Sequence, residues 1–449
     1  MTSDISGRWH GVVDTGSVRA KLAFTLAPSE RLATLHLTVA GDISLPLDLA
    51  GGRAAFIAAA YDVAFDLAPD ASGERLIGTC RTAHVLYPIS FQRGHAQPKP
   101  RAPRPQTPQP PFPYAEATVS FAGADGGRRV GTLTRPASPP PWPAVILSGC
   151  MGPFDRDETQ SGHKAMALWA DILTRAGLAT LRFDKRGVGA SEGKYAANTT
   201  GDLADDLARA LPFLRAQSGI DPARVGLVGH SEGSHVSAEV AAGDPSLTCL
   251  VMLTPAGMDM EATFETEMFR AAIAVGGTPI PGAEARIVLD RELRRAGRAP
   301  TAEEAVALTR EVLTRAAAAG DFPSAHIERR AAMSASPWQR YWWGYDHTAP
   351  LRRLACPVLV VFGGLDLQAT PDWHAPPIRA ALANHPDATL IELPGLNHFL
   401  QTARTGAVSE YGDLEETLAP AAISLVRNWL VSKLSVAPDK PPRGGADPG

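Results

Sequence analysis

The first hundred residues contain short runs in which apolar residues alternate with polar ones, a pattern typical of half-buried β-strands. Leu35, Leu37 and Val39 alternate within one such run, and Gly, Pro and Asp residues separate the runs. We therefore expect residues 1–95 to form a small antiparallel β-domain, either a barrel or a sandwich. The candidate strands are 19–26, 34–39, 43–49, 62–67, 76–82 and 85–91.

The pattern changes twice further along the chain. Residues 96–113 are rich in proline, which removes amide donors and favours a semi-rigid linker. From residue 114, apolar runs alternate with stretches of helical periodicity, and this alternation predicts a mainly parallel sheet flanked by helices over residues 114–435. The tail 436–449 is rich in Pro and Gly and is predicted to be disordered. The eight candidate strands of this sheet are 117–121, 129–134, 144–147, 178–183, 225–228, 248–253, 358–362 and 389–393.

Composition narrows the class of protein. The net charge of −4 gives no electrostatic reason to expect nucleic acid. No apolar run approaches the roughly 20 residues of a membrane-spanning helix, and the N-terminus has no visible secretory signal. A cytoplasmic location is expected, or export if a leader was removed. The four cysteines are far apart in sequence, so we expect buried thiols and no metal site.

The most specific motif is Gly-His-Ser-Glu-Gly at residues 229–233, directly after one apolar run and before a stretch of small residues. A G-x-S-x-G sequence between a strand and a helix is the nucleophile elbow of an α/β-hydrolase. A second copy at 189–193 lies in a loop and does not open a helix. Its context therefore excludes Ser191 and favours Ser231 as the nucleophile.

A serine nucleophile needs a base, and the base needs an orienting acid. In α/β-hydrolases the chain order is serine, acid, histidine, each in a loop after a strand. Asp366 follows the strand predicted at 358–362, and His398 follows the one at 389–393. The competitors are less well placed relative to the strands or the elbow; they are Asp372, His230, His235, His347, His374 and His385.

The oxyanion of the intermediate needs backbone donors. We expect one from Glu232, which follows the nucleophile, and one from Met151, in the loop after the third strand. Cys150 in the same loop is not expected to be a nucleophile, since a serine elbow already exists. The long insertion at about 257–346 has helices predicted at 261–274, 283–297 and 301–319. We interpret it as a helical cap whose Met and aromatic side chains either line a pocket or attach the cap.

Several further motifs resemble bacterial carboxylesterases of the EstD type, which are α/β-hydrolases with an accessory N-terminal β-domain. The motifs that carry the resemblance are 148–157, 183–191, 363–368 and 397–401, together with the elbow, the segments 410–411 and 417–420, and the N-terminal 7–11. The resemblance implies hydrolysis of short-chain carboxylic esters by Ser231, His398 and Asp366, with no metal or organic cofactor. The expected partner is a small ester substrate; the sequence leaves homo-oligomerisation open.

Two rival functions stay open at this point. The same triad cleaves amides and thioesters, so a peptidase or a thioesterase of this fold is an alternative. A catalytically silent protein that uses its β-domain and linker for binding is the other alternative.

Overall fold

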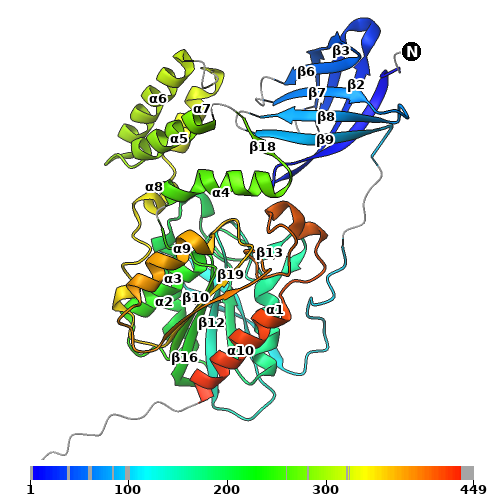
Figure 1. Cartoon of the computed structure of the whole chain (residues 1–449). Coiled ribbons are helices and arrows are strands. Elements are labelled where there is room, and N and C mark those ends of the chain that lie inside the picture. Colours follow the sequence, from blue (N-terminus) through cyan, green and yellow to red (C-terminus); the bar gives the residue numbers. More distant parts are fainter. Residues whose placement is uncertain are drawn as a thin grey trace, which may run out of the picture.

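The computed structural model describes residues 4–37, 41–58, 63–82, 85–96, 102–258, 260–280, 283–319, 322 and 324–435. Two large sheets dominate it, one built from the N-terminal strands and one from strands between residues 115 and 393 (Figure 1). The predicted tail lies outside the described residues. Within these ranges, no helix has the length and apolarity needed to cross a membrane.

The N-terminal strands form an antiparallel sheet in the order β4-β3-β2-β1-β9-β8-β7-β6-β5. Strand β4 also packs against β6, so the sheet curls into a nearly closed barrel. Phenylalanines at 24, 56, 65 and 91 pack edge to face or stacked inside it. The predicted antiparallel β-domain is confirmed. Its strands are β1 (Gly7–Asp14), β2 (Arg19–Ala27), β3 (Leu32–Leu37), β4 (Gly41–Pro46), β5 (Asp48–Ala50), β6 (Arg53–Ala58), β7 (Val63–Pro69), β8 (Arg75–Arg81) and β9 (Val85–Arg93).

Strands β1 and β6 were absent from the candidate strands. In β1, Trp9 and Val13 point inward, but the inward position between them is Gly11, which interrupts the apolar alternation. The glycine is required because a Cβ at this position would collide with the ring of Phe91. The ring of Phe91, which is distant in sequence, thus fills the space that a side chain at position 11 would take.

The single strand predicted at 43–49 is wrong, because the structure divides it into β4 and β5. Strand β4 ends at Pro46, which has no N–H to continue a ladder. Leu47 is buried, and its N–H donates to the carbonyl of Arg31 at 2.8 Å. Strand β4 therefore pairs with β3, whereas β5 pairs with β6.

The second sheet has eight strands in the order β10-β11-β15-β12-β16-β17-β19-β20. The β10–β11 and β11–β15 pairs are antiparallel and the later pairs are parallel. The predicted α/β-hydrolase sheet is therefore confirmed. Its strands are β10 (Ala115–Ala122), β11 (Arg128–Arg135), β12 (Trp142–Ser148), β15 (Ala179–Phe183), β16 (Ile220–His230), β17 (Cys249–Leu253), β19 (Val358–Gly363) and β20 (Ala388–Leu393).

Helices cover both faces of this sheet. Helices α2 (Thr200–Arg215), α3 (Glu232–Gly243) and α9 (Pro371–Ala381) pack on one face, and α1 (Ala165–Arg175) and α10 (Pro420–Ser435) pack on the other. The buried strands are continuous apolar runs, as in β17 and β19, because both faces are covered. Because β12, β16, β19 and β20 run parallel, their carboxyl ends lie at one edge of the sheet. Loops at this edge can bring polar side chains together.

The insertion after β17 comprises α4 (Met260–Ala274), β18 (Thr278–Pro279), α5 (Ala283–Gly297), α6 (Ala302–Ala318), α7 (Ile327–Met333) and α8 (Pro337–Gly344). Figure 1 shows α4 between the eight-stranded sheet below and the barrel and helices α5, α6 and α7 above. Helix α6 begins with a capping box, in which Thr301 accepts from the N–H of Glu304 and the Glu304 side chain accepts in return.

The proline-rich linker is anchored along its second half to the domain that contains the eight-stranded sheet. Gln106 bonds to the backbone of Thr417 and Leu418, and its Nε2 donates to the Leu418 carbonyl at 2.9 Å. Arg104 donates to the carbonyls of Ser161 and Leu414, both at 2.7 Å. Side chains supply these bonds, which the proline pattern alone did not indicate.

Candidate active site

Ser231 lies in a sharp turn between β16 and α3. Its φ of 54° and ψ of −118° are strained for a residue with a side chain. The flanking glycines allow the turn, because a Cβ at Gly229 would collide with the carbonyl of Gly233, and one at Gly233 would collide with the carbonyl of Ser148. This is the geometry that a nucleophile elbow requires.

The second pentapeptide has a structural explanation. Ser191 is buried, and its Oγ donates to the carbonyl of Asp184 at 2.8 Å and accepts from the N–H of Val130 at 2.9 Å. The first bond closes the loop after β15 on itself, and the second holds the loop against β11. The Ser191 hydroxyl is occupied by backbone groups and does not line the cavity that contains Ser231.

Asp366 and His398 are brought together by the loops after β19 and β20. Nδ1 of His398 lies 2.8 Å from Oδ2 of Asp366, and the N–H groups of Gln368 and Ala369 donate to Oδ1 at 2.8 and 2.9 Å. Burial opposes ionisation of Asp366, but His398 and these two N–H groups outweigh it, so the pKa of Asp366 is lowered. An ionised Asp366 keeps the proton of His398 on Nδ1 and leaves Nε2 available as a base.

Ser231 and His398 line one cavity of about 420 Å³. Among the described residues, no hydrogen bond joins the Ser231 hydroxyl to His398. The wall is formed by the elbow, the loop after β12, the insertion, the loop after β19, and two segments distant in sequence that contribute Ser17 and Val408. The other lining residues are Ser17, Met151, Glu232, His235, Ala256, Glu267, Met268, Ala271, Trp342, Leu367, Gln368, Ala369, His374 and Val408.

The competing candidates have other partners. Asp372 is exposed at the start of α9 and lies near Arg270. His374 is buried, and its Nε2 lies 2.9 Å from Glu267 while Nδ1 accepts from the N–H of Gly257. His235 packs edge to face against His347, outside hydrogen-bond reach of any described partner. His385 accepts from the N–H of the nearby residue 387 in the loop before β20.

The loop at residues 149–153, here called the oxyanion loop, is held from two sides. Lys185 donates to the carbonyls of Cys150 and Gly152. The Cys150–Met151 peptide is trans, so its N–H points away from its carbonyl. Within the described chain the Met151 N–H has no hydrogen-bond partner and is directed away from Lys185. It remains available as a donor, like the N–H of Glu232 at the first turn of α3.

The buried carboxylate of Glu158 was not anticipated. Its Oε1 accepts from the N–H of Cys150 at 2.5 Å and lies 2.7 Å from Nδ1 of His230. Nε2 of His230 in turn donates to the backbone carbonyl of His398 at 2.9 Å. Cys150, Glu158 and His230 have the spacing of a metal site. Oε1 of Glu158 and both ring nitrogens of His230 are nevertheless occupied by each other and by backbone groups, while Oε2 of Glu158 has no hydrogen-bond partner among the described residues. We therefore interpret them as an ion pair that joins the oxyanion loop to the loop of His398.

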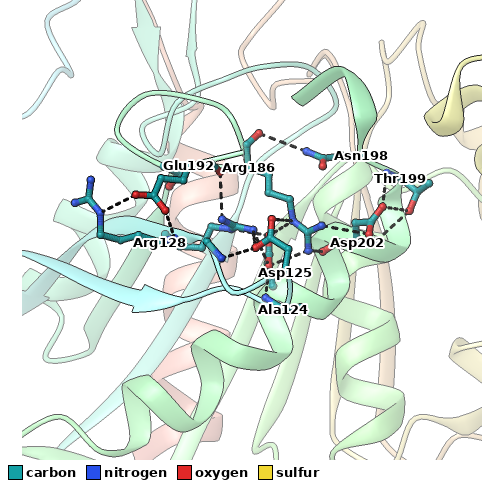
Figure 2. Close-up of polar contacts among 12 residues, drawn as sticks. Ala124, Asp125, Arg128, Arg186, Glu192, Asn198, Thr199 and Asp202 are labelled. Atoms are coloured by element: carbon teal, nitrogen blue, oxygen red, sulfur yellow. Dashed lines mark hydrogen bonds and ion pairs between the residues drawn. The ribbon is translucent and has the colours of Figure 1, made fainter. Parts of the chain in front are cut away.

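The loop that carries Lys185 is anchored by a buried network of charges. Asp206 accepts from Arg129 at 2.8 Å and from Arg186 at 2.7 Å. Figure 2 shows the guanidinium of Arg186 directed toward Asp125 and Asp202. Because Arg186 directly follows Lys185, this network fixes the backbone from which Lys185 reaches the oxyanion loop.

The insertion contributes both lining and attachment, as the two readings of its side chains anticipated. Met268 and Trp342 line the cavity, and Phe269 packs against the barrel core. Trp338 donates to the carboxylate of Glu232 at 2.7 Å, which attaches α8 to the first turn of α3. The side chain of Phe264 lies outside the described part of the structure.

Comparison with known proteins places this geometry in a family. Residues 162–402 match the family described as serine aminopeptidase, S33. The esterase EstD of Thermotoga maritima is 23% identical over 273 residues, which cover 60% of this chain and 57% of EstD. The thiohydrolase aneE of Aspergillus aculeatus is 31% identical over 130 residues, which cover 29% of this chain and 36% of aneE.

A solved structure of a Pyrococcus furiosus esterase is 15% identical with a TM-score of 0.43, and the match covers 76% of this chain and 100% of that one. The chain spans little more than half, or less, of the length of the curated relatives it matches. The resemblance to EstD-type esterases expected from the motifs is confirmed by the match to EstD. Since the family match covers more than half of the sequence, this chain belongs to the serine aminopeptidase S33 family of α/β-hydrolases.

Proposed function

We propose that the protein is a serine esterase that hydrolyses short-chain carboxylic esters through an acyl-enzyme. The observation that carries the proposal is the 2.8 Å contact between His398 Nδ1 and Asp366 beside the strained Ser231 in one cavity. The similarity to an esterase supports the ester as substrate.

The chemistry follows from the protonation states. Ser231 Oγ attacks the ester carbonyl carbon while Nε2 of His398 takes the hydroxyl proton. The imidazolium, stabilised by Asp366, then gives that proton to the leaving alcohol. Water attacks the acyl-enzyme with His398 again as the base, and the carboxylic acid and free Ser231 are released.

The negative charge on the carbonyl oxygen needs fixed donors. The N–H groups of Met151 and Glu232 are our candidates, because neither is used elsewhere among the described residues and both residues line the cavity. Lys185 adds a positive charge behind the Met151 peptide. Its burial disfavours the ammonium form and is the largest single influence, but the surrounding groups, Glu232 first among them, together outweigh it and the pKa of Lys185 is raised.

The cavity supports a small substrate. About 420 Å³ lies toward the lower end of the range for ligand pockets. Acyl group and alcohol must share this space, and the wall is largely apolar, with Met268, Leu367 and Trp342. Short, uncharged esters fit these conditions.

The test compares p-nitrophenyl acetate and butyrate hydrolysis by wild type, Ser231→Ala and the matched control Ser191→Ala. We expect S231A to lose activity by about 10⁴-fold or more, while S191A keeps the specific activity of its folded fraction. Equal activity of S231A and wild type would overturn the proposal.

Thioesters are a second candidate, favoured by the similarity to a thiohydrolase. An acyl-coenzyme A thioester and an aminoacyl p-nitroanilide in the same assay separate the classes. A kcat/KM for either that exceeds the ester value would replace the esterase assignment. A fluorophosphonate probe that fails to label Ser231 would instead favour a silent binding protein.

A further inference from the structure

One turn of the N-terminal barrel reaches the catalytic cavity. The turn at residues 15–18 joins β1 to β2, and Ser17 at its tip is exposed and lines the same cavity as Ser231 and His398. The turn is well defined: the N–H of Gly16 donates to Asp14 at 2.9 Å, and Val18 and Thr15 exchange hydrogen bonds. A barrel that formed only a separate module would not place a side chain in the wall of this cavity.

The turn is fixed to the catalytic domain. The carbonyl of Gly16 accepts from the N–H of Ser409 at 3.0 Å, next to Val408, which also lines the cavity. Gly16 has a φ of 80°, and a Cβ there would collide with the carbonyl of Ala271 in α4. Beside the turn, Arg19 pairs with Asp413 in the C-terminal part of the catalytic domain. Contacts to α4 and to the segment 409–413 therefore hold the turn beside the cavity.

Helix α4 joins the barrel to the cavity wall. Met268 and Ala271 face the cavity, whereas Ala272 is buried in the barrel core with Phe269 packed against it. Directly after α4, β18 pairs with β9 and so extends the barrel sheet. Figure 1 shows β18 beside β9, with α4 below the barrel. The helix therefore has one face in the substrate site and the other in the barrel.

From these contacts we infer that the N-terminal barrel sets substrate size: its β1–β2 turn, through Ser17, closes the cavity beside Met268, Ala271 and Val408. The inference rests on the proposed function. Because Ser17 lines the cavity together with these three residues, the turn limits how far an ester substituent extends toward the barrel. Short esters are accepted, and longer or bulkier ones meet the turn.

Point variants of the full chain test this, because deletion of the barrel would expose Ala272 and the edge of β18. Ser17→Phe narrows the mouth and Ser17→Gly widens it. Ile57→Phe, on an exposed barrel strand position that does not line the cavity, is the matched control. For each, kcat/KM is measured with p-nitrophenyl esters of two to eight acyl carbons and with acetate esters of alcohols of increasing size.

We expect S17F to lower kcat/KM at least tenfold for the largest member of one series and less than threefold for the smallest, which also shows that the variant is folded. S17G should raise kcat/KM for the largest member of that series relative to the smallest, and I57F should leave this ratio unchanged. A uniform change across both series, or none, overturns the inference while the esterase assignment stands. If Ser231 of the wild type neither hydrolyses these esters nor reacts with a fluorophosphonate, the proposed function fails, and the inference fails with it.

Discussion

Glu158 and His230 form a buried ion pair behind the catalytic loops, with 2.7 Å between Oε1 and Nδ1. Nδ1 faces a carboxylate and Nε2 faces the carbonyl of His398, so both ring nitrogens face acceptors. Burial favours neutral forms, yet Glu158 raises the pKa of His230 and His230 lowers that of Glu158. The pair therefore joins the oxyanion loop and the His398 loop as carboxylate and imidazolium.

Replacing Glu158 by Gln should destabilise the protein in a pH-dependent way. Removing one partner of a buried ion pair costs about 3 to 5 kcal/mol. The raised pKa of His230 means that its contribution is complete below the unfolded value near 6.5 and is lost as pH rises through the folded value. The lowered pKa of Glu158 means that its contribution is complete above about 4.5 and is lost as pH falls through the folded value.

Urea unfolding across the pH range checks this. The difference between wild type and E158Q should be largest between these limits and shrink on both sides. The exposed Glu328→Gln, whose carboxylate pairs with Arg310 at the surface, should leave unfolding nearly unchanged. A difference for E158Q that is independent of pH would contradict the ion pair.

Asp366→Asn should reduce kcat/KM by about 10⁴-fold with little change in fold. The Asn amide can donate a hydrogen bond to Nδ1, which favours the histidine tautomer that carries its proton on Nε2. Asp372→Asn is the matched control, since Asp372 lies six residues away and is exposed. Ester hydrolysis by the two variants discriminates between the two candidate acids, and comparable losses in both would remove Asp366 from its assigned role.

The sequence predicted the eight-stranded sheet well because its central strands, such as β17 and β19, are continuous apolar runs buried on both faces. Asp366 and His398 were found because each follows a predicted strand. The barrel was harder to predict. Gly11 hides the alternation of β1 because Phe91, eighty residues away, fills its place.

The residues that surround and position the candidate catalytic groups could not be predicted from the sequence. Glu158 occupies a loop at a φ of 54°, 72 residues before its partner His230, and no spacing links the two. Lys185 acts on carbonyls, which any residue provides, so no motif identifies its target. Ser17 reaches the cavity only because the barrel docks on α4, and docking between domains leaves no local pattern.

Ser191→Ala should separate stability from catalysis. The Ser191 hydroxyl both donates to and accepts from buried backbone groups, so its loss leaves the N–H of Val130 without its acceptor. We expect a decrease in the free energy of unfolding of about 1 to 3 kcal/mol. The rate of fluorophosphonate labelling at Ser231 should stay within about twofold of wild type. A large loss of labelling in a stably folded S191A would show that this loop takes part in the chemistry.

Lys185→Met should weaken catalysis through the oxyanion loop. Without the ammonium group the carbonyls of Cys150 and Gly152 lose their donor, and the peptide that carries the Met151 N–H is no longer held in place. A misplaced oxyanion donor costs about 10² to 10³-fold in kcat and leaves KM nearly unchanged, because the donor acts on charge that develops only in the transition state. Steady-state kinetics on p-nitrophenyl acetate measure this split, with the exposed Lys194→Met as control. A K185M variant with a raised KM and an unchanged kcat would show that Lys185 serves substrate binding rather than the oxyanion loop.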